Sequence, residues 1–237
     1  MIWPEPIPES QRSIDDNWAC ISYATTHAIE SQIKVQTGKT VNISARFLAI
    51  MSGTIPGIGN SFVKVFETAL QRGWLDAADC PEPPMFTDAE YYGFNITPEL
   101  LNKALKNKED WDIDYTSNAT LADLIKAPLI AWVPQYTANH AVEVLDPFTR
   151  FDTYIPYRRP LGPYQKLYQF LIKKKDNMKL INDNGTYYLE GNKGYFGINK
   201  VEFLNLLIKI TDQVENRKPV GISQGIIETI ADAFRIK

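Results

Sequence analysis

The sequence predicts an α+β fold, with helices in the first half of the chain and antiparallel strands in the second. Two observations support this prediction. Apolar residues recur at helical spacing as far as about residue 126, with capping residues before them and glycines after several of them. From Leu129 onward, short apolar runs are separated by turn residues. Helices followed by strands, without regular alternation, are typical of a fold whose layers are segregated.

Each predicted helix has a start signal, a stop signal or both. Asp15 and Asp16 suit the positive end of a helix that runs from about 18 to 36, and Gly38 ends it. Thr97, with a proline directly after it, is a good helix opening. Further helices are predicted at residues 44–51, 61–72 and 120–126.

The second half of the chain is predicted to contain strands. They are expected at residues 129–133, 140–145 and 150–154. Asp146 and Pro147 form the turn between the last two. Apolar residues within 167–171 predict a short helix before the lysine run 173–175, and residues 76–96 are predicted to be a long irregular connection.

The C-terminal part is predicted to be a small appendage of strands and helices. Residues 178–198 hold turn signals between tyrosine-rich strands, and residues 202–210 are predicted to be helical. Ser223 is the expected cap of a last amphipathic helix. The apolar face of that helix consists of Ile226, Ile230 and Phe234. This face either docks into a partner protein, as part of an oligomer or larger assembly, or folds back on its own domain.

These elements predict the following organisation. The main domain covers residues 1–160, with a helical half at about 13–110 and a strand half at about 111–160 joined by the N-terminal arm. A helical linker, a β-rich module, and a second linker with the C-terminal helix follow it, at residues 161–177, 178–212 and 213–237.

Composition excludes several classes of function. The net charge is −3 and no basic patch is present, so nucleic acid is not an expected partner. Two cysteines and two histidines provide neither a disulfide framework nor zinc-ligand spacing, and no metal or cofactor is predicted. The chain begins without a signal-peptide pattern and has no apolar run long enough to cross a membrane. The predicted location is therefore the cytoplasm or a virion.

A group of polar and aromatic residues carries the functional argument. Gln11 stands six residues before Asn17, which with Trp18 lies at the start of the first predicted helix. Asn139 and His140 open a predicted strand more than a hundred residues later. Asp152 and Tyr154 lie on the neighbouring predicted strand.

This pattern resembles that of the papain family of cysteine peptidases. That family has Gln, five residues and Cys-Trp-Ala at its first helix, later a His followed by Ala or Gly and Val, and then Asn-Ser-Trp. Gln11, Trp18-Ala19 and the run from His140 to Val142 match it, and residues 152–154 match it loosely. Residues 59–75 resemble the family's glycine loop with the helix that follows. The resemblance covers about residues 10–160.

The resemblance implies a two-lobed fold, a helical lobe beside a small antiparallel β-barrel lobe. It also implies roles for individual residues: His140 and Asp152 as catalytic partners and Gln11 as a donor to the oxyanion. The cleft between the lobes is then an extended-peptide groove. Its candidate wall residues are Trp18, Gly59, Asn60, Trp132, Asn139 and Tyr154.

One departure from the family pattern decides the expected function. In this register Asn17 occupies the position of the catalytic cysteine, and a carboxamide does not attack a peptide carbonyl as a thiolate does. The sequence therefore predicts an inactive pseudo-peptidase that serves as a binding or structural module, for instance in a phage virion. In the same register Cys20 lies one turn deeper in the helix, as a buried structural cysteine.

Two active alternatives remain open. In one, Cys20 is a displaced nucleophile that works with His140 in a peptidase or amidase. In the other, Asp15 or Asp16 performs acid–base work on a water with His140, although acidic residues at this place are more often helix caps. His27 lies in the middle of the same helix and is assigned no catalytic role.

Overall fold

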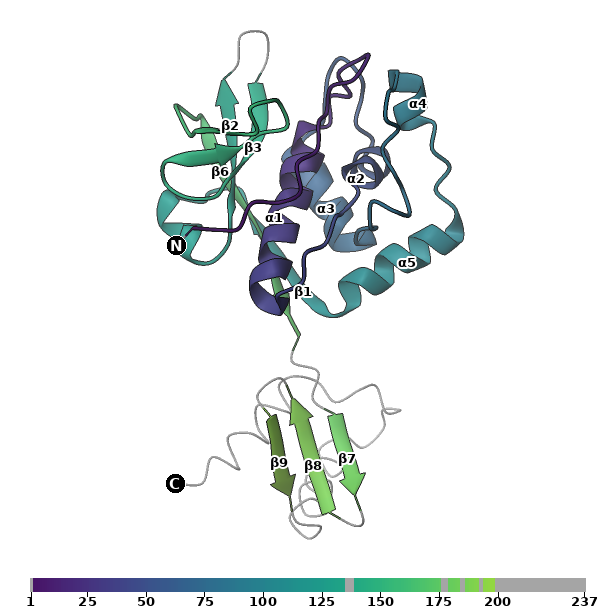
Figure 1. Ribbon diagram of the computed structural model, residues 1–237, viewed down its shortest axis with the longest axis vertical. Coiled ribbons are helices and arrows are strands. Elements are labelled where there is room, and N and C mark those ends of the chain that lie inside the picture. Colours follow the sequence, from purple (N-terminus) through teal and green to yellow (C-terminus); the bar gives the residue numbers. More distant parts are fainter. Residues whose placement is uncertain (1, 135–138, 176–178, 184–185, 192–193, 199–237) are drawn as a thin grey trace. The chain divides into compact units, whose positions relative to one another are not determined.

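The computed structural model describes residues 2–134, 139–175, 179–183, 186–191 and 194–198, and the chain divides into two compact units at 175/176. The first unit contains the helices and a six-stranded sheet (Figure 1). Its α-helices are α1 (Cys20–Thr37), α2 (Ala45–Ser52), α3 (Phe62–Arg72), α4 (Asp88–Tyr92) and α5 (Pro98–Glu109). The short 3₁₀ helix η1 spans Leu121–Ile125.

The sheet of the first unit is antiparallel and has the strand order β1-β6-β2-β3-β4-β5. These strands are β1 (Trp111–Thr116), β2 (Leu129–Pro134), β3 (Asn139–Val144), β4 (Thr149–Phe151), β5 (Arg158–Pro160) and β6 (Lys166–Lys174). In the described residues β1 and β5 are the two edges, so the sheet is open and does not close into the predicted barrel.

Helix α1 is the centre of the first unit and lies between the sheet and helices α2 and α3 (Figure 1). Nearly all of it is buried from Ile21 to Ile33. Gln32 fixes it to the sheet, because its amide donates to the carbonyl of Phe170 at 2.9 Å and accepts from the N–H of Ile172 at 2.9 Å. The main apolar core fills the space between the helices and this face of the sheet. A second apolar core consists of other strand residues packed together with Trp3 and with Leu124 of η1.

The predicted helix within 167–171 is wrong, because this segment belongs to the nine-residue strand β6. Leu167, Phe170 and Leu171 fit helical spacing, but β6 pairs with β1 on one side and β2 on the other. Backbone pairing on both sides therefore decides the conformation of this segment. The predicted irregular connection at 76–96 contains the short helix α4, which begins with a capping box between Thr87 and Glu90.

The second unit holds a three-stranded antiparallel sheet in the order β7-β8-β9. Its strands are β7 (Lys179–Asp183), β8 (Thr186–Gly191) and β9 (Gly194–Ile198). The predicted helices at 202–210 and after Ser223 lie outside the described residues. No helix in the described part of the chain is long and apolar enough to span a membrane.

Four glutamates lie in or near α1 and the N-terminal arm, of which Glu30 and Glu143 are buried and Glu9 and Glu82 are partly buried. Burial raises the pKa of Glu30 to about 8, although two backbone N–H groups oppose the shift. Burial is also the largest cause that raises the pKa of Glu9 to about 9 and that of Glu82 to about 7. It raises the pKa of Glu143 well above its usual value. The fold therefore holds these groups as neutral acids at mildly acidic pH.

Replacing Glu143 by Gln is expected to stabilise the protein at alkaline pH. Folded Glu143 keeps its proton while the unfolded side chain loses it above about pH 4.5, so stability falls as pH rises. Gln retains the acceptor for the Ser31 hydroxyl (2.9 Å) without the ionisable group. We expect the unfolding free energy at pH 8 to rise by more than about 1 kcal/mol, with little change at pH 5.

Urea unfolding at the two pH values measures this effect. Glu67→Gln, at an exposed position of α3, is the control and should change stability little at either pH. An equal response of the two variants at pH 8 would contradict the assignment of Glu143 as a buried neutral acid.

Candidate functional site

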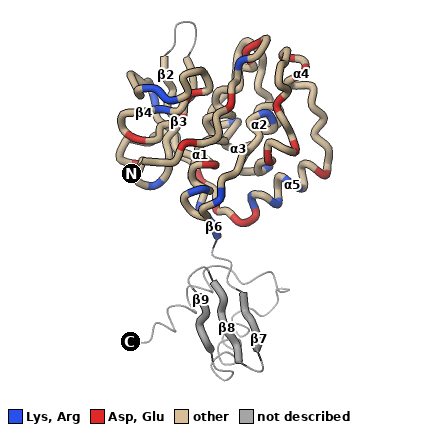
Figure 2. The backbone as a smooth tube through the Cα atoms, viewed as in Figure 1, with Lys and Arg blue, Asp and Glu red and all other residues tan. Residues whose placement is uncertain are grey.

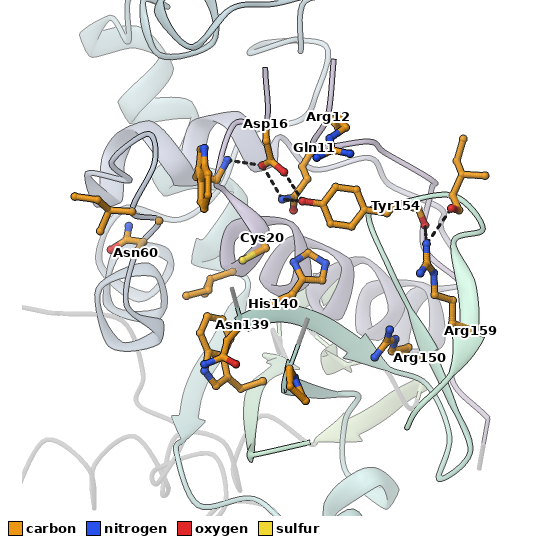
Figure 3. A pocket seen from close by; sticks show the side chains of 17 residues that line it. Gln11, Arg12, Asp16, Cys20, Asn60, Asn139, His140, Arg150, Tyr154 and Arg159 are labelled. Carbon is orange, nitrogen blue, oxygen red and sulfur yellow. Dashed lines mark hydrogen bonds between the residues drawn. The ribbon is translucent and has the colours of Figure 1, made fainter. Parts of the chain in front are cut away.

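A pocket of about 1030 Å³ in the first unit is lined by the start of α1, the start of β3 and the segment after β4, among others (Figure 3). Its lining residues come from the N-terminal arm, α1, the loop after α2, and strands β2 to β5. They are Gln11, Arg12, Asp16, Trp18, Cys20, Ile21, Ile58, Gly59, Asn60, Trp132, Pro134, Asn139, His140, Arg150, Tyr154, Ile155 and Arg159. The six predicted wall residues are all among them.

Cys20 is the first residue of α1 and lines this pocket. Its side chain is partly exposed, whereas Cys80, the other cysteine, is buried in the main core. Because the first N–H groups of a helix have no acceptor within it, the thiol stands beside unpaired backbone donors and the positive end of the helix dipole. Cys20 is thus the accessible thiol of the described residues.

His140 lies at the start of β3, opposite Cys20 (Figure 3). Its Nε2 is 2.9 Å from Oδ1 of Asp152, so Nδ1 is the nitrogen left to face the thiol. Burial by itself lowers the pKa of His140, but hydrogen bonds with Asp152 and Cys20 and the charges of both outweigh it. The pKa of His140 is raised to about 9, which keeps the ring protonated at neutral pH.

Asp152 is fully buried behind His140. Burial would raise its pKa, but the bond and charge of His140, the N–H of Tyr154 and the charge of Arg150 lower it. Its Oδ2 lies 3.6 Å from Nη2 of Arg150 and 3.7 Å from Nε of Arg159. The carboxylate therefore orients the imidazole and carries a negative charge next to three cationic side chains.

The structure places Asn17 outside the pocket, which corrects its assignment to the nucleophile position. Asn17 is fully buried, donates to the Tyr23 hydroxyl at 3.0 Å and accepts from the Ala19 N–H at 3.1 Å. It holds the turn that leads into α1. The prediction that Cys20 lies one turn deeper is also wrong, because α1 begins at Cys20 rather than near Trp18.

Trp18 explains the late start of the helix. Its backbone adopts φ 59°, a left-handed conformation that side-chain-bearing residues rarely take and that interrupts a right-handed helix. Its N–H is bound by the Asp16 carboxylate at 2.9 Å, which fixes the turn. Such strain costs about 1–3 kcal/mol and is typical of functional sites.

Gln11 lines the same pocket as Cys20, but its amide is fully engaged. Nε2 is 3.0 Å from Oδ1 of Asp16 and 2.6 Å from the Tyr154 hydroxyl, while Oε1 accepts from the Thr153 hydroxyl at 2.8 Å. The Tyr154 hydroxyl in turn donates to Asp16. This network ties the N-terminal arm to the segment after β4 across one end of the pocket.

Sequence reasoning missed the charged residues of the pocket wall. Arg12, Arg150 and Arg159 line it, and Asp16 accepts hydrogen bonds there rather than capping α1 as predicted. No sequence signal distinguished these arginines from solvated surface residues, since they are far apart in the chain. His27, by contrast, is buried against Phe151 with a pKa lowered by burial to about 3, and has no part in the site.

The described residues contain no group of histidine, cysteine or acidic side chains that is able to hold a metal ion. The pocket wall does contain the Cys20 thiol and the His140 imidazole, and the buried Asp152 carboxylate is bound to the far side of that imidazole. This is the arrangement of side chains used for nucleophilic catalysis by cysteine.

The first unit has the fold of papain-like cysteine proteases, as comparison with solved structures shows. The proform of the ragweed pollen allergen cysteine protease Amb a 11 superposes with a TM-score of 0.51 and 14% identity, over 71% of this chain and 63% of that one. The clostridial cysteine protease Cwp84 after propeptide cleavage gives a TM-score of 0.51 and 12% identity, over 75% and 58%.

This chain thus spans less than two thirds of either structure. No protein-family model matches the sequence, and no curated protein matches it.

Proposed function

We propose that this protein is a cysteine-dependent hydrolase of amide or peptide bonds, in which Cys20 is the nucleophile. The observation that carries the proposal is the position of Cys20 at the start of α1, against His140, whose far nitrogen is bound by Asp152. Nucleophile, base and orienting group therefore follow one another as in other hydrolases that use a catalytic triad.

The first half of the reaction forms a thioester. The Cys20 thiolate attacks the substrate carbonyl carbon and forms an S–C bond, and the carbonyl π electrons move onto oxygen. When the tetrahedral intermediate collapses, the C–N bond breaks and its electron pair leaves with nitrogen. His140 gives its proton to that nitrogen, so the products are an acyl-thioester and a neutral amine.

The second half regenerates the enzyme. Neutral His140 takes a proton from a water, whose oxygen attacks the thioester carbonyl. The S–C bond breaks, the acyl group leaves as an acid, and Cys20 and imidazolium His140 are restored. Asp152 stabilises the imidazolium at both stages without itself taking the proton.

The developing oxyanion needs hydrogen-bond donors. The backbone N–H of Cys20, at the first position of α1, is one donor without an intrahelical acceptor. The Gln11 amide becomes a second donor only when it exchanges one of its bonds to Asp16 or Tyr154. Substrate binding that displaces this network would therefore assemble the oxyanion site.

The geometry favours this function over the inactive binding module that the sequence suggested. The inactive hypothesis rested on an asparagine at the nucleophile position, and Asn17 does not line the pocket. The peptide groove remains part of the proposal, with the six wall residues as contacts for substrate. A role in a larger assembly rested on the C-terminal β module and the C-terminal helix. The helix lies outside the described residues, and no further observation favours this role.

Trapping the acyl-enzyme tests the proposed function. The protein is mixed with an activated ester of an N-blocked amino acid, quenched in acid and analysed by intact mass and peptide mapping. We expect the acyl group on the peptide that contains Cys20, because acid slows hydrolysis of the thioester. Ester turnover with the acyl group on another residue, or without a covalent adduct, would count against Cys20 as the nucleophile.

A further inference from the structure

The two ends of the pocket differ in chemistry. Asn60 lies at one end, in a loop with Ile58 and Gly59 that adds no charged side chain to the pocket wall. The other end contains Arg12, Arg150, Arg159 and Tyr154, and Figure 3 shows it across His140 from Asn60. A substrate that fills both ends is therefore uncharged on one side of the reacting bond and anionic on the other.

The proposed mechanism tells which end holds which part of the substrate. His140 must give its proton to the leaving nitrogen, so the leaving group lies on the His140 side of Cys20. Behind His140 come Asp152 and the arginines that face it. The cationic end is therefore the leaving-group side, and the uncharged end receives the acyl part.

Positive charge exceeds negative charge at the leaving-group side. Its carboxylates are Asp152 and Asp16, and its cations are Arg12, Arg150, Arg159 and protonated His140. Asp152 lies 3.6 Å from Arg150 and 3.7 Å from Arg159. Within the described residues, Nε of Arg150 is buried without an acceptor. Figure 2 shows basic positions around β4, the strand that carries Arg150.

Arg12 is the cation of this group that remains available to a ligand. It is exposed, and its guanidinium carbon lies 5.6 Å from the centre of the Tyr154 ring. No acidic side chain of the described residues forms an ion pair with this guanidinium. Asp16, the acidic residue of the same wall, already accepts from Gln11, Trp18 and Tyr154. Arg159, by contrast, is held to its own loop, because its Nε and Nη2 donate to the carbonyls of residues 154–156.

We propose that the leaving-group side of the pocket binds a carboxylate of the substrate, with Arg12 as its direct partner and Arg150 and Arg159 as the source of attraction. The substrate then carries a carboxylate close after the bond that is cut. Two sources share this chemistry: the free C-terminus of a peptide cut one or two residues from its end, and an acidic side chain in that position. The inference rests on the proposed hydrolase function.

A pool of peptides tests it. Peptides of random sequence are prepared with either free or amidated C-termini, incubated with the protein, and the cut positions are read by mass spectrometry. We expect cuts at the last bonds of the free-acid pool to be at least about tenfold more frequent than at the same bonds of the amidated pool. Enrichment of Asp or Glu after the cut in both pools would instead identify the side chain as the source, and supports the same carboxylate site.

Arg12→Gln should remove most of either enrichment, since a hydrogen bond to a charged group contributes roughly 1.5–3 kcal/mol, which is about tenfold or more. Arg12→Lys should restore part of it, because the charge is retained. Arg158→Gln is the matched control: Arg158 is exposed on the same strand as Arg159, does not line the pocket, and pairs with Glu5 at 2.8 Å.

The outcomes separate the two proposals. Cys20-dependent cutting that ignores carboxylates, or that responds equally to Arg12→Gln and Arg158→Gln, overturns the carboxylate site and leaves the hydrolase function standing. Absence of any Cys20-dependent cutting overturns both.

Discussion

Cys20→Ala is expected to lower kcat/KM for peptide or ester hydrolysis by about 10³-fold or more. The substitution removes the atom that forms the thioester, and Asp152 and His140 alone have no nucleophile to activate. Removing the nucleophile of a triad elsewhere costs several orders of magnitude. Initial rates at several substrate concentrations, with parent and variant at equal folded concentration, measure the change.

Cys80→Ala is the matched control for this experiment. Cys80 is fully buried in the main core, where burial raises its pKa, and it does not line the pocket. The variant should keep its activity and lose some stability, as small cavities in a core do. If Cys20→Ala kept the same kcat/KM as the parent, catalysis would have to use another group.

Substitution of Asp152 should change the pH dependence as well as the rate. His140 must be protonated to serve the leaving group, and its pKa of about 9 predicts that kcat/KM falls as pH rises through 9. Asp152→Asn retains a hydrogen-bond acceptor but removes the charge that favours the imidazolium. The alkaline limb should then move to lower pH, with kcat/KM at pH 8 reduced by at least about tenfold.

Asp152→Ala separates charge from orientation. It removes the acceptor at 2.9 Å as well as the charge, so the imidazole loses its fixed direction. Its kcat/KM should fall below that of Asp152→Asn at pH 6, where both variants still protonate His140 in part. A pH–rate profile of Asp152→Asn that coincides with the parent's would show that Asp152 does not control His140.

Helices α2, α3 and α5 and strands β2 and β3 followed well from local signals, whereas strand β1 and helix α4 were not predicted. Ser44 and Ser61 cap α2 and α3 and are the first residues of the predicted ranges 44–51 and 61–72, and Gly38 ends α1 as predicted. Strand β6 was not predicted from the sequence, because its apolar spacing suits a helix. Its extended conformation depends on pairing with β1 and β2. The open sheet likewise depends on which strands pair, information that no single segment carries.

The predicted wall residues line one pocket together with His140, but the residue at the start of α1 is Cys20 and not Asn17. When Trp18 is aligned with the family's tryptophan, Asn17 falls at the position of the catalytic cysteine. Cys20 then falls inside the predicted helix. The left-handed backbone of Trp18 delays the helix start until Cys20, and a strained residue of this kind leaves no sequence signature. The wall arginines were missed for a related reason, since β4, β5 and the N-terminal arm meet only in the folded chain.

Limited alkylation of the folded protein with iodoacetamide, read by peptide mapping, tests most directly whether a reactive thiol faces His140. Cys20 should be labelled rapidly and Cys80 only after unfolding, and His140→Ala should slow the labelling of Cys20. Labelling of Cys20 at the same rate in parent and His140→Ala, or no labelling of Cys20 before unfolding, would contradict the pairing of thiol and imidazole.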